Sequence, residues 1–195
     1  MQEHRLFDGR LLFLGRLAPE LDQIARAQFA ELWDLHPHKF PQITLHGRSI
    51  RLPRWQQAYG RSYRYAGGVR RALPVPGILR PFLAWAREAV DARLNGLLLN
   101  WYDAARGHYI GAHRDSTAGL IGATPIVTIS VGASRAFRLR PAAGRGFADF
   151  EATHGSVFVM PWNTNLAVKH EVPHRKDSIG RRISITVRAF ACSQP

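Results

Sequence analysis

Seven short segments with a two-residue hydrophobic period fill the second half of this 195-residue chain, and they constrain its fold more than any other feature. Such a period is typical of β-strands, because successive side chains point to opposite faces of a sheet. The predicted strands are residues 96–102, 109–114, 125–131, 135–140, 156–161, 167–172 and 182–190. Glycine and proline residues separate these segments, so the pattern predicts an all-β sandwich or barrel.

Two helices are expected ahead of the strands. Residues 19–35 repeat apolar side chains near the helical period, and Pro19 suits the first turn of a helix. Residues 81–94 place apolar side chains on one stripe and predict a second helix. The chain contains neither a G-x-G-x-x-G nor a Walker loop, which disfavours a nucleotide-cofactor fold. The expected architecture is mainly β, of the α+β class, with helices backing the strands.

The composition sets limits on size and compartment. A chain of 195 residues that is 46% hydrophobic can build one core, and we expect a single domain. The one cysteine, Cys192, excludes an intrachain disulfide and indicates a reducing compartment. No apolar run approaches the roughly 18 residues needed to span a bilayer. We therefore expect a soluble, monomeric cytoplasmic protein that does not associate with membranes.

Positive charge is concentrated in one stretch of the chain. The formal net charge of +13 favours a polyanionic partner. Residues 35–87 contain no Asp or Glu, whereas Lys39 and nine arginines fall there. The middle of this stretch, residues 38–68, is irregular and rich in aromatic residues, which is typical of a hairpin-rich surface lobe. Together these features predict a basic surface for a polyanionic partner.

The stretch YIGAHRDST, residues 109–117, places His113 two residues before Asp115. On a strand both side chains share a face, and with one more histidine they would form a facial triad for a metal. Chance alone predicts 9 × 14/195, or about 0.6, His-x-Asp/Glu triplets, and a lone pair is more often a hydrogen-bonded couple or a solvated strand face. The histidines that follow are His154 in a turn, His170 within a strand and His174 in a charged loop. These patterns leave open whether His170 is a ligand or an ordinary strand residue.

The last strand, RISITVR, alternates polar and apolar residues without a break. Its polar face consists of Arg182, Ser184, Thr186 and Arg188. A half-buried strand with this face in water is the commoner arrangement. Turned inward, the two arginines would instead bind a dicarboxylate, because the guanidinium fork matches carboxylate geometry. Asn100 and Tyr102, on one face of another strand, could complete such a site.

Several segments together resemble the AlkB-type Fe(II) and 2-oxoglutarate-dependent dioxygenases. They are PRWQQAYG, RSYRYAG, LNWY, IGAHRDS, PIVTISVGASRAFRLR, GSVFVMPW, VKHEVP and GRRISITVR, in the family's order. The resemblance implies a double-stranded β-helix, or jelly roll, with N-terminal helices and a nucleotide-recognition lobe. It divides the domain into a helical extension (1–40), the recognition lobe (41–70), a supporting helix (71–95) and the catalytic core (96–190).

The resemblance also implies the residues of the site. His113, Asp115 and His170 would hold Fe(II). Asn100, Tyr102, Arg182, Ser184 and Arg188 match the positions that bind 2-oxoglutarate. In that pattern Tyr102 and Arg182 hold the distal carboxylate, whereas Asn100 and Arg188 hold the one nearest the metal. Ser184 falls where some members have Asn.

The implied substrate is an alkylated base in DNA or RNA that leaves its stack to enter the pocket. Arg54, Tyr63 and Tyr65 match base-contacting positions. His46 replaces the apolar finger of relatives that repair duplexes, which leaves single-stranded substrates open. Some members carry an acid directly after the metal-binding Asp, where this chain has Ser116 and Thr117.

The implied reaction uses O2 and 2-oxoglutarate to hydroxylate the alkyl group and releases formaldehyde, succinate and CO2. One alternative keeps the oxygenase but has it act on a protein or small molecule. Another, from a different class, is a catalytically silent nucleic-acid-binding module. A zinc hydrolase can also use two histidines and a carboxylate, but its mechanism does not call for Arg182 and Arg188.

Overall fold

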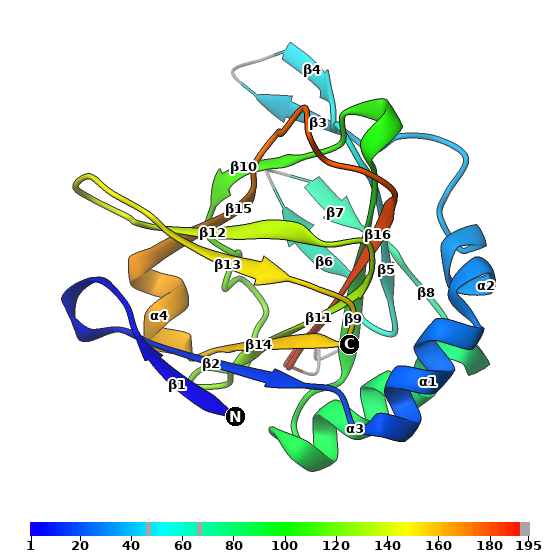
Figure 1. The fold of residues 1–195 in the computed structure, drawn as a ribbon, viewed down its shortest axis with the longest axis horizontal. Helices are drawn as coiled ribbons and strands as arrows, with labels where there is room; N and C mark the ends of the chain where they lie inside the picture. Colours follow the sequence, from blue (N-terminus) through cyan, green and yellow to red (C-terminus); the bar gives the residue numbers. More distant parts are fainter. Residues whose placement is uncertain (46–47, 66–67, 192–195) are drawn as a thin grey trace.

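A computed structural model describes residues 1–45, 48–65 and 68–191; for residues 43–45, 63–65 and 68–70 it describes the backbone alone. Two antiparallel sheets face each other (Figure 1). The major sheet has the order β1 (Gln2–Arg5), β2 (Leu11–Arg16), β14 (Ser156–Met160), β11 (Ile126–Gly132), β16 (Arg181–Arg188), β9 (Gly96–Asp103), β5 (Trp55–Tyr59) and β8 (Ala72–Leu73), of which β8 alone pairs in parallel. The minor sheet has the order β10 (Ile110–His113), β15 (Val168–Val172), β12 (Arg135–Pro141) and β13 (Ala148–Ala152).

The remaining elements lie around these sheets. They are the helices α1 (Pro19–Ala27), α2 (Phe29–Asp34), α3 (Arg80–Ala89) and α4 (Trp162–Ala167), short 3-10 turns at Phe7–Gly9, Gly77–Leu79 and Ala104–Arg106, and two hairpins, β3 (Gln42–Leu45) with β4 (Arg48–Arg51) and β6 (Tyr63–Tyr65) with β7 (Gly68–Arg70). No helix in the described part of the chain is long and apolar enough to cross a membrane.

The outer face of the major sheet packs against α1, α2 and α3 (Figure 1). The apolar side chains of β16, Ile183, Ile185 and Val187, belong to this core and are fully buried. Trp101 of β9 fixes α2 to the sheet, because its indole Nε1 donates to the carbonyl oxygen of Leu32 over 2.9 Å. Since β-strand side chains alternate, the polar residues of β16 must face the minor sheet.

The space between the two sheets is apolar at one end and polar at the other. A buried cluster that includes Phe137, Leu139, Phe158 and Val168 fills the apolar end. This cluster holds the sheets together, so the polar end does not have to contribute hydrophobic stability. The functional site lies at that polar end.

The double-stranded β-helix expected from the sequence is confirmed, and each of the seven predicted strands is present with ends shifted by two residues or fewer. These strands could be predicted because the two-residue period depends only on residues that are close in the sequence.

Three details of the prediction are wrong. Residues 19–35 form two helices, because the backbone at Gln28 (φ −100°, ψ 18°) leaves helical geometry. The expected helix over 81–94 ends at Ala89, although Leu94 is still buried in the core. The helical description of 1–40 fails for β1 and β2, which extend the major sheet and bury Leu12 completely.

Candidate metal and cosubstrate site

Three side chains that can bind a metal ion meet between the sheets. His113 ends β10, His170 lies in β15, and Asp115 follows β10 in the chain. The two histidines are partners in the register of these strands, with ring centroids 4.3 Å apart. Oδ1 of Asp115 lies 3.8 Å from Nε2 of His113 and 3.9 Å from Nε2 of His170. All three ligand atoms lie within 4.8 Å of one another, so one ion can contact them all.

The protonation states of the two histidines suit metal binding. Burial is the main cause that lowers the pKa of His113 below its ordinary value and that of His170 to about 3. Both imidazoles are therefore neutral near pH 7, the form that offers a lone pair to a metal. Nδ1 of His113 lies 2.9 Å from the carbonyl oxygen of Gly111. Because a carbonyl only accepts, the proton sits on Nδ1 and the lone pair of Nε2 faces the other two ligands.

Arg188 fixes the orientation of the Asp115 carboxylate. Its Nε donates to Oδ2 of Asp115 over 3.1 Å, and its Nη2 donates to the same oxygen. Burial alone would raise the pKa of Asp115, but the charge of Arg188 outweighs it, together with the two imidazoles where acid protonates them, and holds the pKa below its ordinary value. With Oδ2 occupied, the ionised carboxylate presents Oδ1 to the two histidines. Two imidazole nitrogens and one carboxylate oxygen on one side fit Fe(II) with open positions opposite.

Arg182 supplies a second buried positive charge beside this cluster, and no carboxylate of the described residues forms an ion pair with it. It is 1% exposed, its Nε donates to Ser130 Oγ over 2.9 Å, and its guanidinium carbon lies 5.3 Å from the centre of the Tyr102 ring. Burial lowers its pKa to about 10, so it stays charged near pH 7. Within the described residues its buried Nη1 has no hydrogen-bond partner. A buried cation with a spare donor in the pocket fits a carboxylate group of a ligand.

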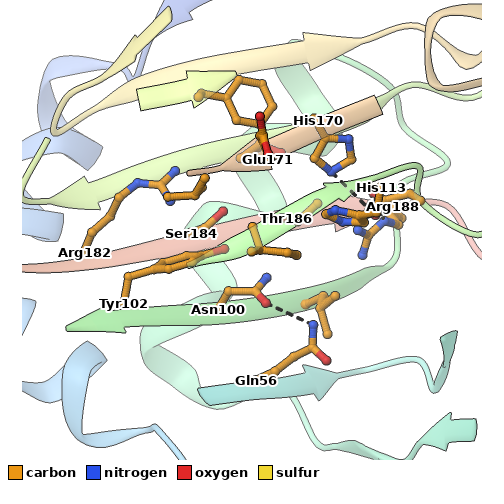
Figure 2. Close-up of a pocket in the computed structure, with 16 residues that line it drawn as sticks. Gln56, Asn100, Tyr102, His113, His170, Glu171, Arg182, Ser184, Thr186 and Arg188 are labelled. Carbon is orange, nitrogen blue, oxygen red and sulfur yellow. Dashed lines mark hydrogen bonds and ion pairs between the residues drawn. The ribbon is translucent and has the colours of Figure 1, made fainter. Parts of the chain in front are cut away.

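The amide of Asn100 is held from one side. Its Oδ1 accepts from Nε of Arg54 over 2.8 Å and from Nε2 of Gln56 over 3.0 Å. These two bonds occupy the oxygen, and Nδ2 faces the interior of the pocket (Figure 2). Asn100 is the strand partner of Ser184, and Tyr102 is the partner of Arg182, so β9 and β16 align their polar residues.

The structure brings most of the predicted site residues together. The pocket between the sheets is lined by all eight residues expected at the metal and the cosubstrate: Asn100, Tyr102, His113, Asp115, His170, Arg182, Ser184 and Arg188 (Figure 2). Their inward orientation rules out the alternative in which the polar face of β16 lies in water. The roles of individual residues in binding stay predictions.

The residues predicted to contact the substrate are placed less completely. Arg54 is 1% exposed and lies behind Asn100, so here it supports the amide; its contact with a base stays a prediction. Tyr63 and Tyr65 are in β6, but their side chains lie outside what the structure describes. His46 lies outside the described residues. Ser116 and Thr117 are described, and neither is among the residues that line the pocket.

Sequence reasoning missed several polar residues of this site, among them Gln56, Thr128 and Glu171 in the pocket lining and Asn165 beside Asp115. Gln56 lines the pocket and shares the strand face of Arg54, so the two-residue period from Arg54 could have identified it. Asn165, in the unpredicted helix α4, binds the backbone of Asp115. No local pattern pointed to Asn165, because α4 has only six residues.

Replacing Arg182 by lysine tests its role at the cosubstrate. Lysine keeps the charge but loses the planar fork, so we expect 2-oxoglutarate to bind about 10- to 100-fold more weakly, the range of one or two charged hydrogen bonds. Calorimetric titration of 2-oxoglutarate into Mn(II)-loaded protein measures this. Arg93→Lys is the matched control, because Arg93 pairs with Asp91 through Nε and Nη2 and neither residue lines the pocket. Equal weakening in both variants would contradict the role of Arg182.

The fold and the site define a class of protein, a jelly-roll enzyme with a facial metal triad and a basic pocket for a carboxylate cosubstrate. The chain belongs to the 2OG-Fe(II) oxygenase superfamily, whose family model matches residues 22–188. Membership implies Fe(II), 2-oxoglutarate and O2 as the cofactor and cosubstrates of a dioxygenase, and His113, Asp115 and His170 could bind the metal.

Comparisons with known proteins agree with the AlkB-type resemblance. DNA oxidative demethylase ALKBH2 of Bos taurus is 30% identical over 162 residues, 75% of this chain and 56% of the relative. The Mus musculus protein of the same name is 28% identical over 158 residues, 75% of this chain and 66% of the relative. The chain thus spans less than two thirds of the length of these relatives. The solved structure of OsALKBH1 has a TM-score of 0.57 at 16% identity, covering 97% of this chain and all of that one, which supports the fold.

Proposed function

We propose that this protein is an oxidative demethylase of N-alkylated bases in nucleic acid. The observation that carries the proposal is the buried cluster of His113, Asp115 and His170 beside Arg182, in a chain related to DNA oxidative demethylases. Bound iron would couple the oxidative decarboxylation of 2-oxoglutarate to hydroxylation of the alkyl carbon. The N-hydroxymethyl product then loses formaldehyde and restores the base.

The residues of this chain have separate tasks in the proposed reaction. The histidines and Asp115 would hold the ion through neutral nitrogens and one ionised oxygen. Arg182 would bind a carboxylate of the cosubstrate through its spare Nη1. The buried apolar cluster at the other end of the sheets lowers the polarity of the interior, which strengthens these charged contacts.

The basic lobe supports nucleic acid as the substrate class. The β3–β4 hairpin projects beyond β10 (Figure 1). Its strand β4 carries Arg48 and Arg51, both exposed, and Lys39 lies exposed shortly before it. The guanidinium of Arg51 lies over the Phe40 ring at 4.9 Å, and Phe40 stacks on Trp55 with ring centroids also 4.9 Å apart. Anchored arginines of this kind suit phosphate contacts, which position a strand without reading its sequence.

The finer substrate preference is part of the proposal. We propose that a monomer acts within the cell on single-stranded DNA or RNA as well as on duplexes, because the lobe offers charge and the base must leave its stack in any case. The missing acid at Ser116 and Thr117 makes a shifted lesion preference the expected departure from relatives that carry one.

Formaldehyde release tests the proposed reaction. Purified protein with Fe(II), ascorbate and 2-oxoglutarate is expected to release formaldehyde and succinate in equal amounts from oligonucleotides with 1-methyladenine or 3-methylcytosine. Single-stranded DNA, duplex DNA and RNA form the arms of the assay, and etheno-bridged bases extend it. Succinate production without formaldehyde on every methylated arm would contradict demethylation and favour an oxygenase that acts on a protein or small molecule.

A further inference from the structure

The two segments that carry the metal ligands are linked by α4. One segment is the end of β10 with Asp115, and the other is β15 with His170. Helix α4 ends directly before β15, and its Asn165 is 1% exposed although it is polar. Buried amides of this kind are stable only when hydrogen bonds satisfy them.

Asn165 binds the main chain of Asp115 on both sides. Its Oδ1 accepts from the backbone N–H of Asp115 over 3.0 Å, and its Nδ2 donates to the carbonyl oxygen of Asp115 over 3.1 Å. A neighbouring bond joins the same two segments, since Nη1 of Arg114 donates to the carbonyl oxygen of Leu166 over 2.7 Å. The primary amide of Asn165 thus pairs with Asp115 as a neighbouring strand would.

The contact of the Asn165 amide takes the place of strand pairing at Asp115, the carboxylate ligand. The register of β10 with β15 shifts between Ile110 and His113, and the last pair is His113 with His170. Asp115 lies beyond that pair, so within the described residues the ladder does not fix its backbone. The backbone of Asp115 determines where Oδ1 sits, and Oδ1 must stay near both histidines to complete the triad.

We propose that Asn165 is a positioning residue for the metal site, acting through the main chain of Asp115. Its amide places the carboxylate ligand before metal binds, and α4 couples that position to the strand of His170. The inference concerns metal affinity and does not depend on the substrate of the enzyme. A failure of the demethylase proposal would leave it standing, because the experiment below contains no nucleic acid.

Calorimetric titration of Mn(II), a redox-stable probe of the iron site, tests this role in Asn165→Ala. The dissociation constant is expected to rise about 10- to 100-fold, the usual effect of losing a residue that orients a metal ligand. Thr164→Val is the matched control. Thr164 lies in the same helix and is equally buried, but its Oγ1 donates to the carbonyl oxygen of Leu11 in β2 over 2.7 Å and not to the ligand segment. This variant is expected to lose thermal stability while its Mn(II) affinity stays within about threefold of the wild type.

Two further measurements separate positioning from general support of the fold. At saturating Mn(II), 2-oxoglutarate affinity of Asn165→Ala is expected to return to the wild-type value, because the bound ion then holds Asp115 in place. Asn165→Asp keeps an acceptor for the N–H of Asp115 but sets a second oxygen against its carbonyl, and it is expected to weaken Mn(II) binding as well. Wild-type Mn(II) affinity in both Asn165 variants, equal weakening in Thr164→Val, or 2-oxoglutarate affinity that saturating Mn(II) does not restore would each overturn the proposal. If Asn165→Ala does not fold, the Asp variant supplies the same comparison.

Discussion

Replacing His170 by alanine is expected to abolish oxidation and 2-oxoglutarate turnover while oligonucleotide affinity stays within about threefold of the wild type. The imidazole provides one of three ligand atoms that lie within 4.8 Å of one another. Alanine leaves Asp115 and His113 as a two-ligand site, and metal affinity is expected to fall by more than about 100-fold, beyond the effect of losing an orienting residue. Succinate formation and Mn(II) titration measure the loss, and fluorescence anisotropy measures oligonucleotide binding.

His174→Ala is the matched control for this experiment. It removes an exposed histidine four residues further along the chain, which does not line the pocket. Its metal affinity and turnover are expected to match the wild type. Loss of oligonucleotide binding together with turnover in His170→Ala would show that His170 supports the fold instead of the metal.

The sequence predicts those parts of the fold that depend on patterns among neighbouring residues. The alternation of β16 identifies it as a strand, and the two-residue spacing of His113 and Asp115 places them on one face. Neither signal says which face of a sheet is covered. The polar face of β16 points inward because the helices take the apolar face through Ile183, Ile185 and Val187. That choice depends on packing between segments more than a hundred residues apart.

The role of His170, the third candidate metal ligand, also depends on contacts between distant segments. His170 becomes a partner of His113 through the pairing of β10 with β15, which joins strands that are not consecutive in the chain. Residue patterns alone left open whether His170 is a ligand or an ordinary strand residue, and the family resemblance identified it as a ligand. Strands β1 and β2 escaped prediction for a related reason, since β2 is stabilised by pairing with β14 and β1 by pairing with β2.

The sequence does not show which arginines of the pocket are paired with a negative charge. Arg188 is neutralised within the protein by Asp115, whereas Arg182 contacts the neutral hydroxyl of Ser130. Arg54 contacts the neutral amide of Asn100. Glu171, which also lines the pocket, pairs with Arg140. The protein side of the pocket therefore carries an excess of positive charge, which favours an anionic cosubstrate and makes the pair of Arg188 and Asp115 central to the stability of the pocket.

Removing one partner of that pair is expected to be strongly destabilising. The side chains of Arg188 and Asp115 are 3% and 4% exposed. Arg188→Ala leaves the carboxylate buried without its two donors, and breaking a buried pair in this way typically costs about 3–5 kcal/mol of unfolding free energy. Urea unfolding of the metal-free protein, followed by tryptophan fluorescence, measures the loss. The same variant should also bind Mn(II) more weakly, since Oδ1 of Asp115 is no longer fixed.

A double variant and a surface pair make the test specific to burial. Arg188→Met combined with Asp115→Asn removes both charges, and it is expected to be more stable than Arg188→Ala alone because no uncompensated charge stays buried. Arg93→Ala breaks the exposed pair of Arg93 with Asp91, which are joined over 2.6 Å, and is expected to leave the unfolding free energy unchanged because solvent screens that pair. If Arg188→Ala loses no more unfolding free energy than Arg93→Ala, water reaches the Asp115 carboxylate in solution. If the double variant is as unstable as Arg188→Ala, the loss comes from packing of the arginine stem and not from the unpaired charge.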